Sequence, residues 1–142
     1  MVQITLARVY DRPGPEAGFR VLVDRVWPRG VARVGAPWDV WLKELAPSTA
    51  LRQWFAHDRA RWEPFQERYF QELDADAPAR AALEELRGLL ARHAALVLLY
   101  AAKDVECNNA VALRRYLQER GGDQVAAQRR VLLCKRRCAR QA

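Results

Sequence analysis

The spacing of hydrophobic positions changes along this chain, and each change marks a different predicted secondary structure. Apolar and polar residues alternate over Gln3 to Tyr10 and again over Phe19 to Asp24, which is the pattern of β-strands. From Thr49 to His93 the apolar residues recur every three or four positions, as they do on the buried face of a helix. The pattern therefore predicts strands first and helices afterwards.

The connections between the first strands are less clearly specified. The segment DRPGPEAG between the first two predicted strands is rich in proline and glycine, which indicates a loop. It is too short for an ordinary helical crossover, so a hairpin is the simplest topology. Trp38 to Leu45 can be a third strand or part of a helix, and Ala46-Pro47-Ser48 ends it.

Three helical stripes follow, and Asp76-Ala-Pro78 provides an N-cap and a first-turn proline for the third. The stripes are Leu51, Trp54 and Phe55; Trp62, Phe65, Tyr69 and Leu73; and Ala79, Leu83, Leu86 and Leu90.

The stretch AALVLLYAA, Ala94 to Ala102, is apolar throughout, which is typical of a strand buried on both faces. A last helical stripe runs through Ala110, Leu113, Tyr116 and Leu117 to Gly121-Gly122. A strand followed by a helix is a unit of a parallel sheet. We therefore predict that Phe19 to Asp24 and Leu96 to Ala101 are parallel neighbours.

The predicted fold is a single small α/β domain over residues 1–122. It has three layers, a mostly parallel sheet of about four strands, and about four to five helices. A length of 142 residues suits one domain with its own core. Residues 123–142 are interpreted as a basic C-terminal extension.

Composition limits the cellular setting and the cofactors. The longest apolar run is about half of what crosses a bilayer, and the N-terminus lacks the pattern of a signal peptide. We therefore expect a cytoplasmic protein with no membrane contact. The three cysteines, Cys107, Cys134 and Cys138, match neither a disulfide framework nor a C-x-x-C metal pair. Reduced thiols, no metal and no cofactor are expected.

The net charge of +7 is concentrated at the C-terminus, because residues 123–142 carry six basic side chains against Asp123 alone, which amounts to +5. A basic tail favours contact with a polyanion, most simply nucleic acid. The alternative is a solvated extension without a dedicated partner.

Charged residues follow three of the candidate strands. The chain holds three lysines, and two of them are in these positions. The charged pairs are Asp24-Arg25, Lys43-Glu44 and Lys103-Asp104. If the strands are parallel, the pairs gather at the carboxyl edge of the sheet, where open α/β folds bind ligands. The alternative is a buried ion-pair network that only orders loops.

Neighbouring residues add to this candidate site. Trp27 offers a ring on which a base can stack, and Asn108 and Asn109 fall where a helix is expected to begin, near Val105 or Glu106. Those amides can read a ligand or act as local caps. Asp104 can likewise be catalytic or an N-cap. Cys107 can be a nucleophile with a lowered pKa or a small buried filler.

Aromatic and basic residues also alternate through one quarter of the chain, around Trp27, Trp38, Trp41, Trp54 and Trp62. Such interleaving is typical of single-stranded nucleic-acid grooves, but Trp54 and Trp62 fall on apolar helix stripes and are better explained as core residues. His57-Asp58 can position an imidazole for acid-base chemistry, or Asp58 can cap the next helix.

Five motifs, in the order they occur, resemble a bacterial and archaeal family called domain of unknown function 488. They are RVLVDRVWPRG, WLKELAPS, LRQWFAHD, RWEPFQERYFQEL and LLYAAKDVECNNAVALRRYL. The resemblance covers about Gln3 to Leu117 and implies a small α/β domain without an established activity. Two positions depart from the family pattern: Arg59 stands where a proline is common, and Cys107 where a histidine is frequent.

The sequence lacks the P-loop, dinucleotide, nucleophile-elbow and H-E-x-x-H motifs. We therefore predict a protein that binds a phosphate-bearing ligand, a nucleotide or nucleic acid, through Arg25, Arg29, Lys43 and Lys103. The alternatives are a nucleotide-directed hydrolase or glycosidase-like enzyme, with Asp24 or Asp104 as base or nucleophile beside Lys103, and a structural or partner-binding protein.

Overall fold

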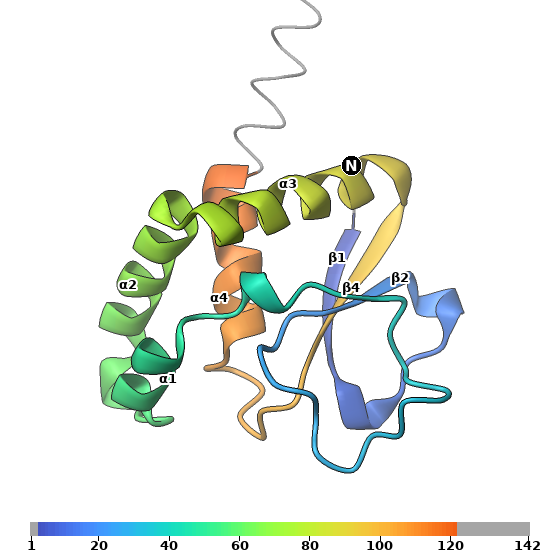
Figure 1. Ribbon diagram of the computed structural model, residues 1–142, viewed down its shortest axis with the longest axis horizontal. Helices are drawn as coiled ribbons and strands as arrows, with labels where there is room; N and C mark the ends of the chain where they lie inside the picture. Colours follow the sequence, from blue (N-terminus) through green and yellow to red (C-terminus); the bar gives the residue numbers. More distant parts are fainter. Residues whose placement is uncertain (1–2, 122–142) are drawn as a thin grey trace, which may run out of the picture. The chain divides into compact units, whose positions relative to one another are not determined.

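The fold is given by a computed structural model that describes residues 3–121 (Figure 1). Within this range four parallel strands form one sheet in the order β1-β4-β2-β3. The strands are β1 (Gln3–Arg8), β2 (Phe19–Leu22), β3 (Val40–Trp41) and β4 (Ala95–Tyr100). The helices are α1 (Thr49–Phe55), α2 (Trp62–Ala75), α3 (Ala77–Arg92) and α4 (Asn109–Tyr116). The prediction of a small α/β domain is confirmed.

The chain divides into two compact units, residues 1–112 and residues 113–142. In the described part of the second unit, α4 ends at Tyr116 and a π-helical turn, Leu117–Gly121, follows. The predicted basic extension, residues 123–142, lies outside the described residues. No helix within residues 3–121 is both long and apolar enough to cross a membrane.

The central strand of the sheet is β4, which pairs with β1 on one side and β2 on the other. Leu96, Val97, Leu98 and Leu99 are 0–1% exposed, because both faces of this strand are covered. Phe19 pairs with Leu96, and Leu22 pairs with Leu99. This confirms the prediction that the second and fourth strands are parallel neighbours.

The predicted hairpin between the first two strands is wrong. β4 lies between β1 and β2, and both run parallel to it. The chain returns from the end of β1 to the start of β2 through residues 9–18, which contain two 3-10 turns, Val9–Asp11 and Pro15–Ala17. Ten residues can span up to about 33 Å, more than the roughly 20 Å length of a six-residue strand. A short loop therefore replaces the helical crossover.

The predicted third strand is shorter than its sequence pattern suggested. Only Val40 and Trp41 pair with β2, and the chain then turns into a 3-10 helix, Lys43–Leu45. The backbone N–H of Leu42 still donates to the Leu22 carbonyl at 3.0 Å, so this edge of the sheet ends just before the predicted charged pair.

One face of the sheet is covered by two tryptophans, one from the loop that follows β2 and one from β3. Val9, Leu22, Val97 and Leu99 form a buried cluster on this face, and Trp38 and Trp41 pack against it. The indole rings of Trp38 and Trp41 shield this apolar cluster, and the same contacts hold the end of the loop against the sheet.

Side-chain caps mark the starts of α1, of α3 and of the short 3-10 helix that precedes α2. Ser48 accepts a hydrogen bond from the Leu51 N–H, Asp58 from the Ala60 N–H, and Asp76 from the Ala79 N–H. The Asp58 cap serves the short 3-10 helix Arg59–Arg61, which leads directly into α2. Of the two roles considered for Asp58, the structure therefore shows the helix cap.

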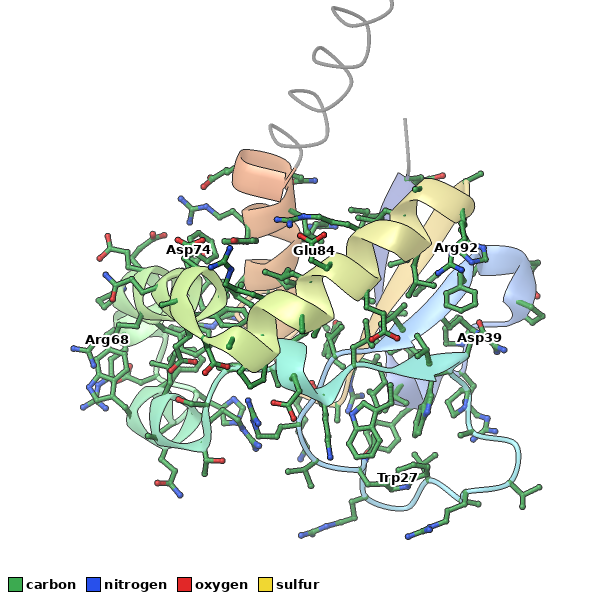
Figure 2. All side chains as sticks on the ribbon, turned by 45° about the horizontal axis from the view of Figure 1, so that its top comes forward. Trp27, Asp39, Arg68, Asp74, Glu84 and Arg92 are labelled. Atoms are coloured by element: carbon green, nitrogen blue, oxygen red, sulfur yellow. The ribbon has the colours of Figure 1, made fainter. Side chains whose placement is uncertain are left out.

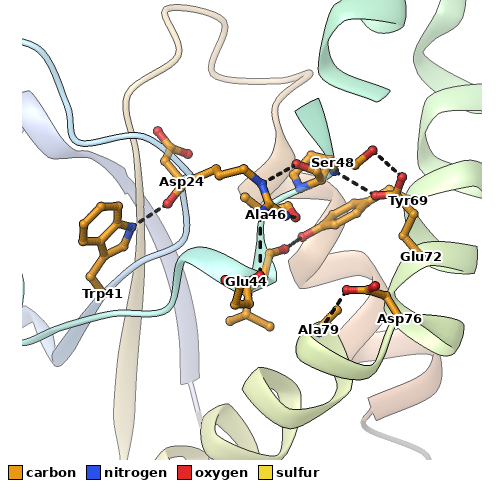
Figure 3. A network of polar contacts seen from close by, with 12 residues as sticks. Asp24, Trp41, Glu44, Ala46, Ser48, Tyr69, Glu72, Asp76 and Ala79 are labelled. Atoms are coloured by element: carbon orange, nitrogen blue, oxygen red, sulfur yellow. Dashed lines mark hydrogen bonds and ion pairs between the residues drawn. The ribbon is translucent and has the colours of Figure 1, made fainter. Parts of the chain in front are cut away.

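A polar network connects the segment before α1 to α2 (Figure 3). The Ser48 backbone N–H and hydroxyl both donate to the Glu72 carboxylate, at 2.9 and 2.6 Å. The Tyr69 hydroxyl donates to the Leu45 carbonyl. These contacts fix the start of α1, which forms one wall of the site described next.

Candidate functional site

A cavity of about 540 Å³ opens where β2 and β4 end. Its walls come from the loop after β2, from α1 and the turn that follows it, and from the start of α4. The polar lining residues are Tyr10, Asp24, Arg25, Arg29, Thr49, Arg52, Gln53, His57, Cys107, Asn108 and Asn109. The cavity is at the carboxyl edge of a parallel sheet, where ligands bind in this class of fold.

Asp24 is held in the cavity wall by groups from distant parts of the chain. Its Oδ2 accepts the Ala101 backbone N–H at 2.9 Å, and its Oδ1 accepts Asn109 Nδ2 at 3.1 Å. The Asp24 carbonyl accepts the Trp41 indole N–H at 2.6 Å (Figure 3). The carboxylate is therefore fixed in direction by the end of β4 and the start of α4.

Burial raises the pKa of the Asp24 carboxyl above its ordinary value. The hydrogen bonds from Asn109 and Ala101 and the charge of Arg52 act in the opposite direction, but their combined effect is smaller. A carboxyl in a cavity with its pKa raised by desolvation is a common feature of functional sites.

The two asparagines have different roles. Asn108 is 3% exposed, and its Oδ1 accepts the Val111 N–H at 2.9 Å, so it caps α4. Asn109 is the first residue of α4 and reaches Asp24. The expectation that the helix begins near Val105 or Glu106 is wrong, because the intervening residues form a turn and the helix starts only after the Asn108 cap.

Arg25 lines the cavity, but neighbouring groups already hold it. Its guanidinium donates to the carbonyls of Ala46 and Pro47 at 3.1 and 3.3 Å and forms an ion pair with Glu44 at 3.5 Å. Arg25 therefore ties the loop after β2 to the segment before α1. For Arg25, this role in ordering a loop agrees with the alternative in which the strand-end charges form ion pairs instead of binding a ligand.

Arg29 and Arg52 are different, because their guanidinium groups form no ion pair or hydrogen bond within the described residues. The Arg29 carbonyl accepts the Tyr10 hydroxyl at 2.9 Å, which positions the Arg29 backbone. Arg52 extends from α1 and lies close enough to influence the pKa of Asp24. Two unpaired cations therefore face the cavity.

The other predicted charges do not join this cavity. Lys43 and Lys103 are exposed and are not among its lining residues. Lys43 lies in the 3-10 turn with its Nζ 6.0 Å from the Trp41 ring centroid. The expected gathering of all three strand-end pairs in one site does not hold for these lysines: β3 ends early, and Lys103 is exposed between lining residues Ala102 and Cys107.

Asp104 has a structural role in that turn. Its Oδ1 accepts the backbone N–H groups of Glu106 and Cys107, at 2.9 and 3.1 Å. Arg59 donates to both carboxylate oxygens at 3.0 and 3.1 Å. The backbone hydrogen bonds, followed by Arg59, lower the pKa of Asp104. Arg59, which departs from the family pattern, thereby holds the turn before α4.

Trp27 lines the cavity but is not the exposed ring that the sequence suggested (Figure 2). Its ring packs edge to face with Trp38 and Trp41, at centroid distances of 4.7 and 5.6 Å. Its indole N–H donates to the Val31 carbonyl at 2.7 Å. Trp27 therefore belongs mainly to the hydrophobic support of the loop.

Two further lining residues come from turns. Burial, followed by the charge of Asp104, raises the pKa of the Cys107 thiol, which is opposite to the lowered value that a nucleophilic role needs. His57 has a left-handed backbone with φ of 57°, directly after Ala56 with φ of 47°. Consecutive residues in this region are uncommon for non-glycine side chains, and the turn directs the chain along the cavity wall.

Sequence reasoning missed the contribution of α1 to the cavity. Thr49, Arg52 and Gln53 line it, and they lie on one helix face because they are spaced at i, i+3 and i+4. The available signal was their position opposite the buried Leu51 and Phe55. The sequence pattern thus predicts which side of α1 is exposed, but it does not predict which other segment lies opposite that side.

A second, shallower depression lies over α1 and α2, with Trp54 at its wall. The guanidinium carbon atoms of Arg68 and Arg61 are 4.0 and 5.2 Å from the Trp54 ring centroid. These contacts fit cation–π packing of α1 against α2, through Arg68, and against the 3-10 helix before α2, through Arg61. Within residues 3–121, no cluster of histidine, cysteine and acidic residues is suited to hold a metal ion.

The fold and the cavity define a small all-parallel α/β domain with a cationic, carboxylate-containing site at the strand ends. The chain belongs to the DUF488-N3i family, described as "Inactive DUF488-N3 subclade", whose model matches residues 3–132. This confirms the resemblance to domain of unknown function 488, and the match extends beyond Leu117 into the basic segment.

Relatives in two well-known bacteria share this domain over almost their whole length. An uncharacterised protein of Mycobacterium tuberculosis, Rv3073c, is 37% identical over 118 residues, which are 83% of this chain and 96% of the relative. An uncharacterised protein of Escherichia coli, YeaO, is 36% identical over 117 residues, 82% of this chain and 98% of the relative. The comparison with solved structures gave no significant match.

Proposed function

We propose that this protein binds a phosphate-bearing ligand, a nucleotide or a nucleotide unit of a nucleic acid, in the cavity at the ends of β2 and β4. The observation that carries this proposal is the position on the cavity wall of two guanidinium groups, Arg29 and Arg52, that have no partner within residues 3–121. Guanidinium groups bind phosphate through charge-assisted and often paired hydrogen bonds. The anion contacts proposed here are Arg29 and Arg52 in place of Lys43 and Lys103.

Two further features support a binding role. The cavity volume of about 540 Å³ falls within the range of about 300 to 1,000 Å³ that is usual for small-molecule sites. Asp24, Arg25 and Asn109 tie the walls together before any ligand arrives. A pre-formed site of this kind loses little conformational entropy on binding.

The enzymatic alternative has less support. Of its three residues, only Asp24 lines the cavity, while Asp104 caps a turn and Lys103 is exposed. The family description "Inactive" also favours binding over catalysis. Incubation with nucleotides, followed by chromatography of the products, tests this alternative directly, and turnover that is lost in Asp24→Asn would support it.

Isothermal titration calorimetry with inorganic pyrophosphate and nucleoside monophosphates tests the binding proposal. Arg29→Gln and Arg52→Gln should each weaken binding about tenfold or more, since each removes a charged hydrogen-bond donor. Arg80→Gln is the matched control, because Arg80 is exposed on α3 and is not part of the cavity. Equal affinities in all three variants would refute the proposal, as would an absence of binding to every ligand.

A further inference from the structure

We infer that the ligand of this cavity is a nucleotide whose base carries an exocyclic amino group, and that Asp24 accepts a hydrogen bond from that group. The inference rests on the proposed function and extends it from the phosphate to the base. It assigns Asp24 as the residue that determines specificity, rather than as a catalytic base.

The first step is the unused acceptor capacity of Asp24. An ionised carboxylate can accept about four hydrogen bonds, and within the described chain the Asp24 carboxylate accepts two, from Ala101 and Asn109. Arg52 is near enough to act on the carboxylate through its charge but does not form an ion pair with it. Asp24 therefore presents fixed, open acceptor positions in the wall of the cavity.

The second step is the mismatch between this carboxylate and a simple anion. Asp24 is the one acidic residue among the lining residues, which also include Arg29 and Arg52. A phosphate near Asp24 would be repelled by a like charge in a partly buried place. A ligand that fits both kinds of group has an anionic part for the arginines and a hydrogen-bond donor for Asp24.

The third step is the apolar part of the wall. Tyr10 and Val26 line the cavity and are 42% and 61% exposed, and Pro28 and Phe55 add further apolar surface. Flat aromatic and apolar surfaces favour a planar ring. Uracil and hypoxanthine offer one ring N–H for each Watson–Crick edge, whereas the exocyclic amino group of adenine, guanine or cytosine carries two N–H donors and suits a carboxylate with more than one open acceptor position. Asp and Glu side chains read the cytosine amino group in this way.

Matched ligand pairs test the inference on the wild-type protein. CMP and UMP differ at ring position 4, where CMP has an amino group and UMP a carbonyl. GMP and IMP differ by the 2-amino group, and AMP and purine riboside 5′-monophosphate differ by the 6-amino group. In calorimetric titrations, the amino-bearing member of at least one pair should bind about tenfold more tightly. Equal affinities within all three pairs would overturn the inference, since an amino group would then not be recognised.

Asp24→Asn assigns the preference to this carboxylate. The substitution keeps the shape and removes the charge, so the preference for the amino-bearing nucleotide should disappear while the affinity for pyrophosphate should rise, because a like charge is lost. A preference that persists in Asp24→Asn would overturn the role of Asp24. Thermal unfolding shows whether the Asp24→Asn variant is folded. If the variant does not fold, the titrations of the wild-type protein still show whether the amino group is recognised.

The two proposals fail in different ways. If neither pyrophosphate nor any nucleotide binds, the proposed function is wrong and the inference falls with it. If nucleotides bind through Arg29 and Arg52 without regard to the amino group, the proposed function stands and only the inference is refuted.

Discussion

Asn109 joins the first turn of α4 to the end of β2 by donating from its Nδ2 to two acceptors at once. One is the Val23 carbonyl at 3.0 Å and the other is Asp24 Oδ1 at 3.1 Å, although Asn109 and Asp24 are 85 positions apart in the sequence. Both N–H groups of the amide are therefore used. This contact sets the direction of the Asp24 carboxylate and closes one side of the cavity.

Asn109→Ala should lower the free energy of unfolding by about 1 to 3 kcal/mol, because the partly buried Val23 carbonyl and Asp24 Oδ1 both lose the donor that Asn109 supplies. Urea denaturation measures the change. Gln71→Ala is the control, since Gln71 is an exposed residue of α2. Equal stabilities of the two variants would show that Asn109 does not hold the site together.

Gly18 and Gly30 form a matched pair for separating backbone strain from steric overlap. Both have positive φ, 134° and 80°, but a Cβ at Gly18 would lie 2.8 Å from the Ala95 backbone, whereas a Cβ at Gly30 meets nothing within 4 Å. Gly30→Ala should cost about 1 kcal/mol, and Gly18→Ala about 3 kcal/mol or more, because β4 cannot move away. Denaturation of both variants provides the comparison, and equal costs would contradict the close approach.

Asp39 should stabilise the fold in a pH-dependent way. Its carboxylate accepts the Arg20 backbone N–H at 2.9 Å and pairs with the guanidinium at 3.2 Å, and the side-chain hydrogen bond to Arg20 is the main cause that lowers the pKa of Asp39. A carboxyl with a lower pKa in the folded state stabilises the protein above the unfolded-state pKa of about 4, and this contribution is lost as the pH falls through the folded-state pKa.

The measurement compares wild type with Asp39→Asn by urea denaturation at pH 6 and pH 2. The wild type should be more stable by about 1 kcal/mol or less at pH 6, since the pair is partly exposed. The difference should become smaller at pH 2. A difference of the same size at both values would rule out ionisation of Asp39 as its source.

Replacing the six basic residues of 123–142 with glutamine should weaken non-specific binding to single-stranded oligonucleotides, because these residues supply most of the net charge of +7. The dependence of binding on salt should also become less steep, as fewer counterions are released. Fluorescence anisotropy across a salt series measures both effects. An unchanged slope would show that this segment does not contact the nucleic acid.

The sequence was most informative where one local pattern had one structural solution. The uninterrupted apolar run of β4 fitted a strand covered on both faces, and the predicted cap at Asp76 marks the start of α3. The order of the strands depended on β4 inserting between β1 and β2, which no local pattern specifies. For this reason the hairpin prediction failed while the individual strands were correct.

The candidate site was predictable in part for the same reason. Asp24, Arg25 and Asn109 follow strands that are neighbours, and the structure brings them together. Lys103 follows β4 as well, but a turn capped by Asp104 directs the chain elsewhere. Arg52 was missed because its position depends on the packing of α1 beside the loop after β2, a contact between segments that share no sequence pattern.

The strand order also determines when the sheet can assemble. Gln3 of β1 pairs with Ala95 of β4, so during synthesis β1 has no strand to pair with until most of the chain has left the ribosome. Helices α1 to α3 depend on nearby residues and can form earlier, at a synthesis rate of about 5 to 20 residues per second. For several seconds the first strand therefore has no hydrogen-bonding partner, and its alternate apolar side chains stay uncovered until β4 has emerged.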